Sequence, residues 1–299
     1  MRIKNEKITA PTKGTIYILI SAFSFGSYGI WSRMMSGHFG EFSQAWTRGL
    51  ILAIVTLTIG FVFKLFKPIA KKDLKWFLMI ALAGGLNQAP YFFGFEHLSV
   101  GTATLLFYAA LVFGGYLLGK FIFNELLDRV KIISLIIAMF GLFTIYQFSL
   151  APSQILPASL TIMAGLMGAI SAVLPKKLSS DYPEVQIMSG YFIVMIIANG
   201  ILSSVFNDPL PQFVLSVPWL GQLSYSVAML VANVTVIMGF KYLDASIGSL
   251  IGLAEVMFAA IFGYFFFSEI LSTSTIVGGI LIIVAAILPN IGLFNKNVK

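Results

Sequence analysis

Two ionisable residues fall inside long apolar stretches of this sequence, and their types suit different chemistry. Glu255 is the single charged residue of positions 245–268, and Arg48 is the single charged residue of positions 42–63. An ionised group is costly to place in hydrocarbon, so each of these residues is a functional candidate by default. A carboxyl group can bind and release a proton or pair with a cationic substrate, whereas a guanidinium can hold a substrate carboxylate.

Both residues also have structural interpretations. Glu255 is the eleventh residue of its apolar run, about 15 Å along a helix and near the bilayer centre. Gly248, Gly252 and Ala259 share its helical face, which favours close packing against another helix and leaves a purely structural hydrogen bond as an alternative. Arg48 lies nearer one end of its run, where it can bind substrate, pair with Glu255 in one state of a cycle, or snorkel to the interface.

The composition excludes most classes of protein that work in water. Of the 299 residues, 58% are apolar and 10% charged, and 28 are phenylalanine. This composition cannot cover a water-soluble surface, which excludes a soluble enzyme, a nucleic-acid binder and a disordered chain. The chain has no cysteine and two histidines, so we expect no metal site and no cofactor. The sequence contains no phosphate-binding loop with a lysine and no Ser/His/Asp arrangement at mid-membrane depth, so nothing in it indicates an enzyme.

Runs of about 20 residues with little or no charge predict the membrane-spanning helices. The fold class is therefore all-α, a polytopic membrane protein with ten transmembrane helices. A run without charge over residues 132–175 is too long for one span, and a polar, proline-containing turn at 147–157 divides it into two helices. The other predicted spans cover residues 14–32, 42–63, 76–95, 98–119, 185–207, 219–240, 245–268 and 270–295.

The distribution of basic residues predicts the orientation. With the N-terminus in the cytoplasm, every Lys and Arg other than Arg33 and Arg48 falls on the cytoplasmic side of the ten-helix arrangement. We therefore expect both termini in the cytoplasm and a location in the cytoplasmic membrane, with the first span as an uncleaved signal anchor. The same distribution explains the sequence pI of about 9.5 without an anionic partner.

Polar and aromatic residues near mid-membrane depth predict a substrate cavity. Pro90 should kink the third span, and such a kink is tolerated where a cavity satisfies the freed backbone groups. A single Ser or Tyr at these positions more often helps helices to pack, so the prediction rests on the convergence of several helices. The predicted substrate-binding residues are Glu255, Asn87, Tyr91, Ser24, Tyr28, Trp31, Arg48, Tyr108, Tyr225 and Asn233, and Glu255 is also the predicted proton-coupling residue.

An internal repeat divides the sequence into two halves. Residues 94–98 read Gly-Phe-Glu-His-Leu and residues 239–243 read Gly-Phe-Lys-Tyr-Leu, and each segment precedes a helix rich in small residues. Each helix ends at an acid, Glu125 or Glu269, which we expect to be structural. Chance recurrence of Gly-Phe pairs is the competing explanation, but the matched ends and spacing favour a repeat. Because each half holds five spans, the second half must be inverted relative to the first, as in many secondary transporters.

These features resemble the drug/metabolite transporter superfamily, specifically its EamA-type members. The resemblance rests on the repeated stretches 94–125 and 239–269 and on the Arg-containing segment 46–50, and it covers residues 14–293. It implies a first EamA-type repeat at 14–150 and a second at 151–294, flanked by cytoplasmic tails at 1–13 and 295–299. It also implies a gradient-driven carrier of small metabolites, frequently amino acids, that moves them outward in many bacterial members.

The predicted function is a secondary active transporter that works by alternating access as a proton-linked exporter of amino acids or related compounds. An importer of a choline-like organic cation, held by Glu255 and surrounding aromatic rings, is one alternative. A membrane-embedded protein with no transport activity is another. The expected partners are a small-molecule substrate, the lipid bilayer and protons as the coupling ion, with no nucleic acid and with the chain as a monomer or homodimer.

Overall fold

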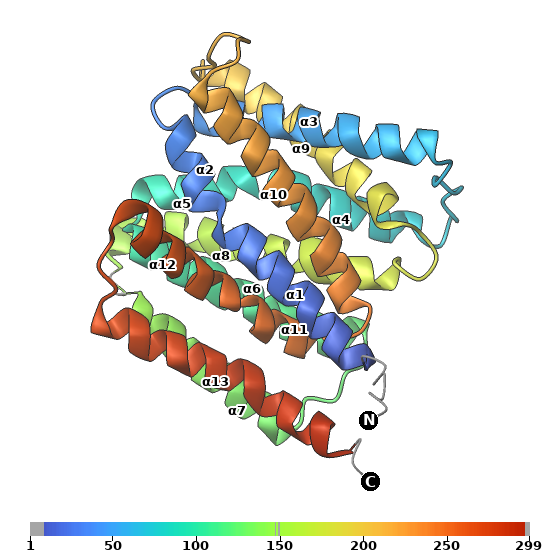
Figure 1. Cartoon of the computed structure of the whole chain (residues 1–299), viewed down its shortest axis with the longest axis vertical. Coiled ribbons are helices and arrows are strands. Elements are labelled where there is room, and N and C mark those ends of the chain that lie inside the picture. Colours follow the sequence, from blue (N-terminus) through green and yellow to red (C-terminus); the bar gives the residue numbers. More distant parts are fainter. Residues whose placement is uncertain (1–8, 147, 149, 297–299) are drawn as a thin grey trace, which may run out of the picture.

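The computed structural model describes residues 9–146, 148 and 150–296, and the side chains of these residues up to 289. This part of the chain is helical and contains no strand (Figure 1). The first half holds α1 (Ala10–Gly26), α2 (Tyr28–Met35), α3 (Glu41–Val62), α4 (Leu74–Leu86), α5 (Gln88–His97), α6 (Val100–Ile122) and α7 (Arg129–Ile145). The second half holds α8 (Ile155–Val173), α9 (Glu184–Val205), α10 (Val217–Phe240), α11 (Ala245–Gly252), α12 (Ala254–Phe267) and α13 (Thr273–Lys296).

The long helices run between two ends of one bundle. The first turn of α1 and the last turns of α13 lie at the same end, which we call the termini end, and α2 and α12 finish at the opposite end (Figure 1). Helices from the two halves pair extensively, with α3 against α9, α13 against α7, α6 against α8 and α1 against α10. The core is therefore built between the halves rather than within each half.

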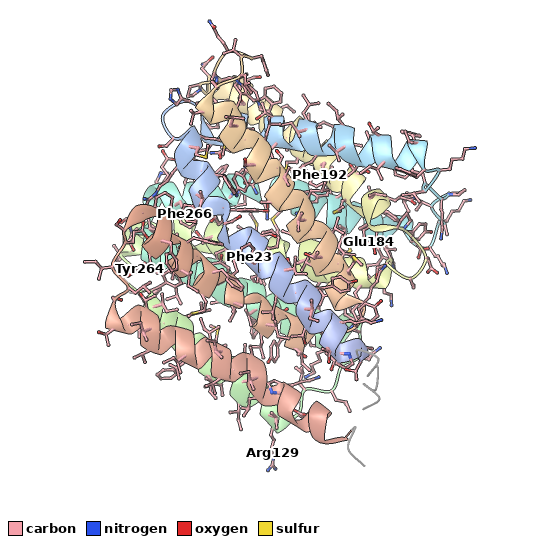
Figure 2. All side chains as sticks on the ribbon, viewed as in Figure 1. Phe23, Arg129, Glu184, Phe192, Tyr264 and Phe266 are labelled. Atoms are coloured by element: carbon pink, nitrogen blue, oxygen red, sulfur yellow. The ribbon has the colours of Figure 1, made fainter. Side chains whose placement is uncertain are left out.

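The outward faces of the bundle are apolar. Six helical segments of the described chain are long and apolar enough to cross a membrane. Large hydrophobic side chains project from the outer faces, among them the labelled Phe23, Tyr264 and Phe266 (Figure 2). Contiguous apolar surface on this scale exceeds what a monomeric soluble protein exposes, and it suits contact with lipid.

Three predicted spans are each broken into two helices at a single residue. Ser27 separates α1 from α2, Asn87 separates α4 from α5, and Leu253 separates α11 from α12. The kink predicted from Pro90 is confirmed: Pro90 has no N–H for the carbonyl four residues earlier, where α4 ends at Leu86. The breaks within the predicted spans 14–32 and 245–268 were not predicted, since neither span contains a proline. The expected division of residues 132–175 into two helices is confirmed by α7 and α8.

An acid from a distant loop caps the start of α3. The N-cap residue Gly40 has no side chain to accept the first N–H groups. Asp208 Oδ2 instead accepts hydrogen bonds from the backbone N–H groups of Phe42 at 2.7 Å and Ser43 at 2.8 Å. A carboxylate at a helix N-terminus is favoured by both the free N–H groups and the helix dipole.

We expect Asp208→Ala to lower the free energy of unfolding by about 1–2 kcal/mol, as loss of an N-cap does elsewhere. The measurement is the melting temperature of the purified protein in detergent. Asp181→Ala is the matched control, because Asp181 is an exposed loop acid whose carboxylate makes no recorded hydrogen bond within the described residues. Equal melting temperatures for Asp208→Ala and wild type would contradict the capping role.

Candidate substrate-binding site

Glu255 lies in the first turn of α12, immediately after the break at Leu253. The backbone there tightens: the Leu253 N–H bonds to Leu250 O at 3.2 Å and the Val256 N–H bonds to Leu253 O at 3.0 Å. Both bonds span three residues rather than four, so the α-helix is interrupted by a 3₁₀ turn. The carboxyl group is consequently carried by a helix N-terminus midway along the segment, a position that favours negative charge.

A tyrosine is the hydrogen-bond partner of the Glu255 carboxyl group. The Tyr108 hydroxyl of α6 donates a hydrogen bond of 2.7 Å to Glu255 Oε1. Tyr91 of α5 packs on Phe107, the neighbour of Tyr108, with ring centres 4.9 Å apart. These residues come from both halves of the chain, so the site is assembled at the interface between the halves.

Arg48 of α3 is buried without a counter-ion. Its residue surface is 2% exposed, which makes the snorkelling alternative wrong. Its Nε and Nη1 atoms are buried and have no hydrogen-bond partner, and no carboxylate of the described residues forms an ion pair with it. The guanidinium carbon stacks 3.8 Å from the centre of the Tyr225 ring, which supplies a cation–π contact but no hydrogen-bond acceptor.

Tyr28 and Tyr225 pack against each other beside Arg48, with ring centres 4.1 Å apart. Gly26, two residues before Tyr28, packs against the backbone of Glu255, where an added Cβ would lie 3.0 Å from Glu255 O. The Tyr28 hydroxyl is buried and has no hydrogen-bond partner. A buried guanidinium and a buried hydroxyl with unused donors are costly, unless a ligand accepts their hydrogen bonds.

Open space adjoins this group of residues. Gly29 follows Tyr28, and Gly252 ends α11. A Cβ atom built on either glycine would meet no heavy atom within 4 Å. Tyr28, Tyr108, Tyr225 and Glu255 are each half-buried rather than fully packed. We refer to Arg48, Glu255 and these three tyrosines as the central site.

The structure places six of the ten predicted residues in this neighbourhood. Arg48, Tyr28 and Tyr225 are in ring or cation–π contact, Glu255 is hydrogen-bonded to Tyr108, and Tyr91 packs on Phe107 beside Tyr108. The other four make local contacts. The Trp31 Nε1–H donates to Ser27 Oγ at 3.0 Å, and Asn233 Nδ2 donates to Met229 O of its own helix. Ser24 is buried in α1, and Asn87 forms the break in the third span with its Oδ1 accepting from Gln88 Nε2.

Two tyrosines of this neighbourhood were not predicted from the sequence. Tyr146 is the C-cap residue of α7 and packs against the cluster that contains Leu253 and Val256, and Tyr191 is on α9, which packs against the α3 helix of Arg48. Tyr146 stands at the end of an apolar run next to the polar turn, which was the available signal. Tyr191 had no local signal, because its position relative to Arg48 depends on the packing of α3 against α9.

A separate cavity of about 760 Å³ opens between α3, α5, α8 and α9. Its lining includes Phe42, Pro90, Phe92 and Phe206 and the acids Glu41, Glu96 and Asp208, but none of the ten predicted residues. Asp208 is engaged in capping α3, whereas Glu41 and Glu96 are exposed at this cavity.

Comparison with known proteins agrees with this architecture. The family model of the EamA-like transporter family matches residues 12–147 and, a second time, residues 155–291. The chain belongs to the EamA-like transporter family. It is therefore a membrane transporter of the drug/metabolite transporter superfamily and not an enzyme.

Two curated relatives and one solved structure extend the comparison. The relatives are both named pseudopaline exporter CntI and come from two strains of Pseudomonas aeruginosa. One is 22% identical over 219 residues, and the other is 23% identical over 221 residues. Each alignment covers 73% of this chain and 76% of the relative. A protein crystal structure matches with a TM-score of 0.79 at 14% identity, covering 96% of this chain and 98% of the other, which shows a shared fold.

Two glycine variants should separate open space from close packing. We expect Gly252→Ala to change the free energy of unfolding by less than about 0.5 kcal/mol, because nothing lies within 4 Å of the new Cβ. Gly165→Ala should destabilise the protein by roughly 1–3 kcal/mol, because its Cβ would overlap the backbone oxygen of Phe107 and push α8 from α6. Thermal unfolding of both variants is the measurement, and a larger loss for Gly252→Ala would contradict the open space beside Glu255.

Proposed function

We propose that this protein is a secondary active transporter that exports small metabolites carrying both a carboxylate and an amine, of the amino-acid class. The observation that carries the proposal is the buried Arg48 guanidinium, which has no counter-ion among the described residues and contacts the Tyr225 ring, with Glu255 on α12 close to the segment of Tyr28. A zwitterionic substrate would complement both groups. The two curated relatives are named as exporters, which supports the outward direction.

Each pole of the substrate would meet a different group. The substrate carboxylate would accept hydrogen bonds from Arg48 Nε and Nη1 and from the Tyr28 hydroxyl, which all lack partners. The amine would approach Glu255, with the faces of Tyr225, Tyr108 and Tyr91 around it. Asn87, Ser24, Trp31 and Asn233 would lie in the wall of the translocation path.

We further propose ten membrane-crossing segments in two inverted halves, residues 14–150 and 151–294, with short tails at 1–13 and 295–299. Support comes from the double match of the family model and from the helices, since joining the pairs separated by Ser27, Asn87 and Leu253 leaves ten segments. An even number of crossings agrees with the common end of α1 and α13 (Figure 1). The basic residues favour the cytoplasmic membrane with both tails inside, as monomer or homodimer.

Alternating access with Glu255 as the proton-binding group completes the proposal. The carboxyl group has Tyr108 as its hydrogen-bond partner, and a Cβ atom on nearby Gly252 would meet no heavy atom within 4 Å. A proton would reach the carboxyl group through this space. An importer of an organic cation is the second candidate, and the tyrosines around Glu255 favour it. Arg48 disfavours it, because an unpaired positive charge close to the same rings would repel a cation.

The role of Arg48 can be tested by binding. We expect Arg48→Gln to weaken binding of amino acids roughly 10–100-fold, because a charge-assisted hydrogen bond contributes about 1.5–3 kcal/mol. The affinity of Arg48→Lys should lie between those of the wild type and Arg48→Gln, since lysine keeps the charge but loses the two-pronged hydrogen-bonding geometry of arginine. Calorimetry on the purified protein is the measurement, and Lys71→Gln in an exposed loop is the control for lost positive charge. Unchanged affinity in Arg48→Gln would remove the carboxylate-binding role.

The role of Glu255 can be tested by separating binding from coupling. Under the proposed role, in which Glu255 carries the proton and also meets the substrate amine, Glu255→Gln should weaken binding and lose flux driven by a pH gradient. If Glu255 carries the proton without meeting the amine, Glu255→Gln should bind and exchange substrate while only the pH-driven flux is lost. If Glu255 pairs with a cationic group, the same variant should lose binding itself, since one charge is left unpaired. If its role is structural, Glu255→Gln should be nearly silent and Glu255→Ala should lower the melting temperature. Wild-type pH-driven flux in Glu255→Gln would rule out proton coupling at this residue.

A further inference from the structure

The two ends of the bundle carry the same short structure, once in each half. Phe123-Asn124-Glu125 follows α6, and Phe267-Ser268-Glu269 completes and follows α12. Asn124 and Ser268 are both left-handed, each with φ of 54°, although neither is glycine. The backbone N–H of each glutamate turns back to the helix, to Gly119 O at 2.8 Å and to Gly263 O at 3.1 Å. The backbone therefore directs both carboxylates in the same way relative to their helices.

A cation from another helix accompanies each glutamate. At the termini end, Lys176 Nζ lies 3.1 Å from Glu125 Oε1 and 5.0 Å from the centre of the Phe123 ring. At the opposite end, Arg33 pairs with Glu269 and stacks 3.7 Å from the centre of the Phe267 ring. Arg33 ends the first segment of the first half and Lys176 ends the first segment of the second half. The two ion pairs occupy corresponding places in the repeat.

The pair at the termini end is engaged with a third element, the start of α11. Glu125 Oε1 accepts from the Ala245 N–H at 2.6 Å, and Oε2 accepts from the Ser246 N–H at 3.2 Å and its Oγ at 3.1 Å. Lys176 Nζ also donates to Leu243 O at 2.8 Å. The N-cap residue Asp244 makes no side-chain cap bond, so Glu125 supplies the cap from the end of α6. We call these contacts the Glu125 latch.

The pair at the opposite end has no such engagement. By the repeat, residues 98–101 at the start of α6 correspond to residues 243–246 at the start of α11. Within the part of the chain that the structure describes, no hydrogen bond joins Glu269 or Arg33 to residues 98–101. The Glu269 side chain is 50% exposed, whereas the Glu125 side chain is 5% exposed. One latch is closed and its counterpart is open in this structure.

We infer that these two ion pairs are alternating latches of the transport cycle. In the state seen here the Glu125 latch holds α6 to α11 and closes the termini end. In the other state Glu269 caps the start of α6 through the backbone N–H groups of Val100 and Gly101, Arg33 bonds to the carbonyl of Leu98, and the Glu125 latch is released. This inference rests on the inverted repeat and alternating access of the proposed function.

The physical basis is competition between two similar closures. A carboxylate at a helix N-terminus gains charge-assisted hydrogen bonds and a favourable dipole interaction, and both ends offer the same backbone groups. Release of one latch leaves free N–H groups at the start of a helix, which water in an open cavity can solvate. Since each closure uses a glutamate and a cation at the start of a helix, bound substrate can select between them.

Distances between spin labels on the full chain in lipid nanodiscs test the inference. The native chain has no cysteine, so labels attach at introduced cysteines alone. Leu126→Cys with Tyr242→Cys reports the termini end, and the corresponding Ile270→Cys with His97→Cys reports the opposite end. All four positions are exposed and lie beside the latches without supplying their carboxylates or cations. Ile136→Cys with Ile280→Cys, on the packed helices α7 and α13, is the control pair that should not change.

We expect Glu125→Ala to lengthen the distance at the termini end and shorten it at the opposite end, with the ratio of the two states shifted about tenfold or more. Glu269→Ala should leave both distances as in wild type, because its latch is open already. In the double variant Glu125→Ala/Glu269→Ala, the distance between the labels at the opposite end should not shorten. Glu125→Gln, which keeps one acceptor and loses the ion pair, should shift the ratio in the same direction by less, and it serves if Glu125→Ala unfolds.

Two results would overturn the inference: Glu125 variants with unchanged distances and wild-type melting temperature, or opening of the termini end with no closure at the opposite end. Amino-acid flux into proteoliposomes, measured on the wild type, keeps the two proposals apart. Flux with unchanged distances would reject the latches and leave the proposed transport intact. The expected distance changes in a protein that moves no amino acid would retain the latches and reject the proposed substrate class.

Discussion

A helix interrupted inside hydrocarbon leaves backbone N–H and C=O groups that lipid cannot satisfy, and this constraint governs where the chain can place its chemistry. The three single-residue breaks, at Ser27, Asn87 and Leu253, each precede a residue of the predicted site by a few positions. Tyr28 follows the first break, Tyr91 the second and Glu255 the third. Breaks are tolerated there because the helices meet around internal space, so the same feature that costs backbone hydrogen bonds also directs side chains into the site.

The electrostatics of the central site follow from that arrangement. Glu255 lies at the start of α12, with a tyrosine hydroxyl donating to it, so its negative charge has local support. Arg48 has an aromatic face and no acceptor for two of its nitrogen atoms. The Glu255 carboxyl group therefore has a hydrogen-bond donor, whereas two nitrogen atoms of Arg48 have no acceptor. A ligand carboxylate bound to Arg48 would supply those missing acceptors.

The sequence predicted the positions of the long helices and the two intramembrane charges, since charge-free length and isolated charges are local properties. It also predicted the break near Pro90, because proline acts on the backbone of its own helix. The break at Leu253 has no proline and was not predicted. The position of Tyr191 on the helix that packs against the α3 helix of Arg48 was not predicted either, because it depends on the packing of two helices far apart in sequence. Burial of Arg48, which decides against snorkelling, likewise depends on neighbours from the second half.

The repeat in the sequence predicted equivalent acids at Glu125 and Glu269 but assigned them the same structural role. Their chemistry is equivalent, with a left-handed residue before each glutamate and a cation stacked on the phenylalanine two positions earlier. Their surroundings are not, since one carboxylate caps α11 and the other is half exposed. Local sequence fixes what each end can bind, whereas the conformation of the whole bundle decides which end is bound. Alternation between two states requires that only one of the two glutamates caps its helix at a time. If both glutamates capped their helices in the same conformation, both ends would be closed in that conformation and neither would open.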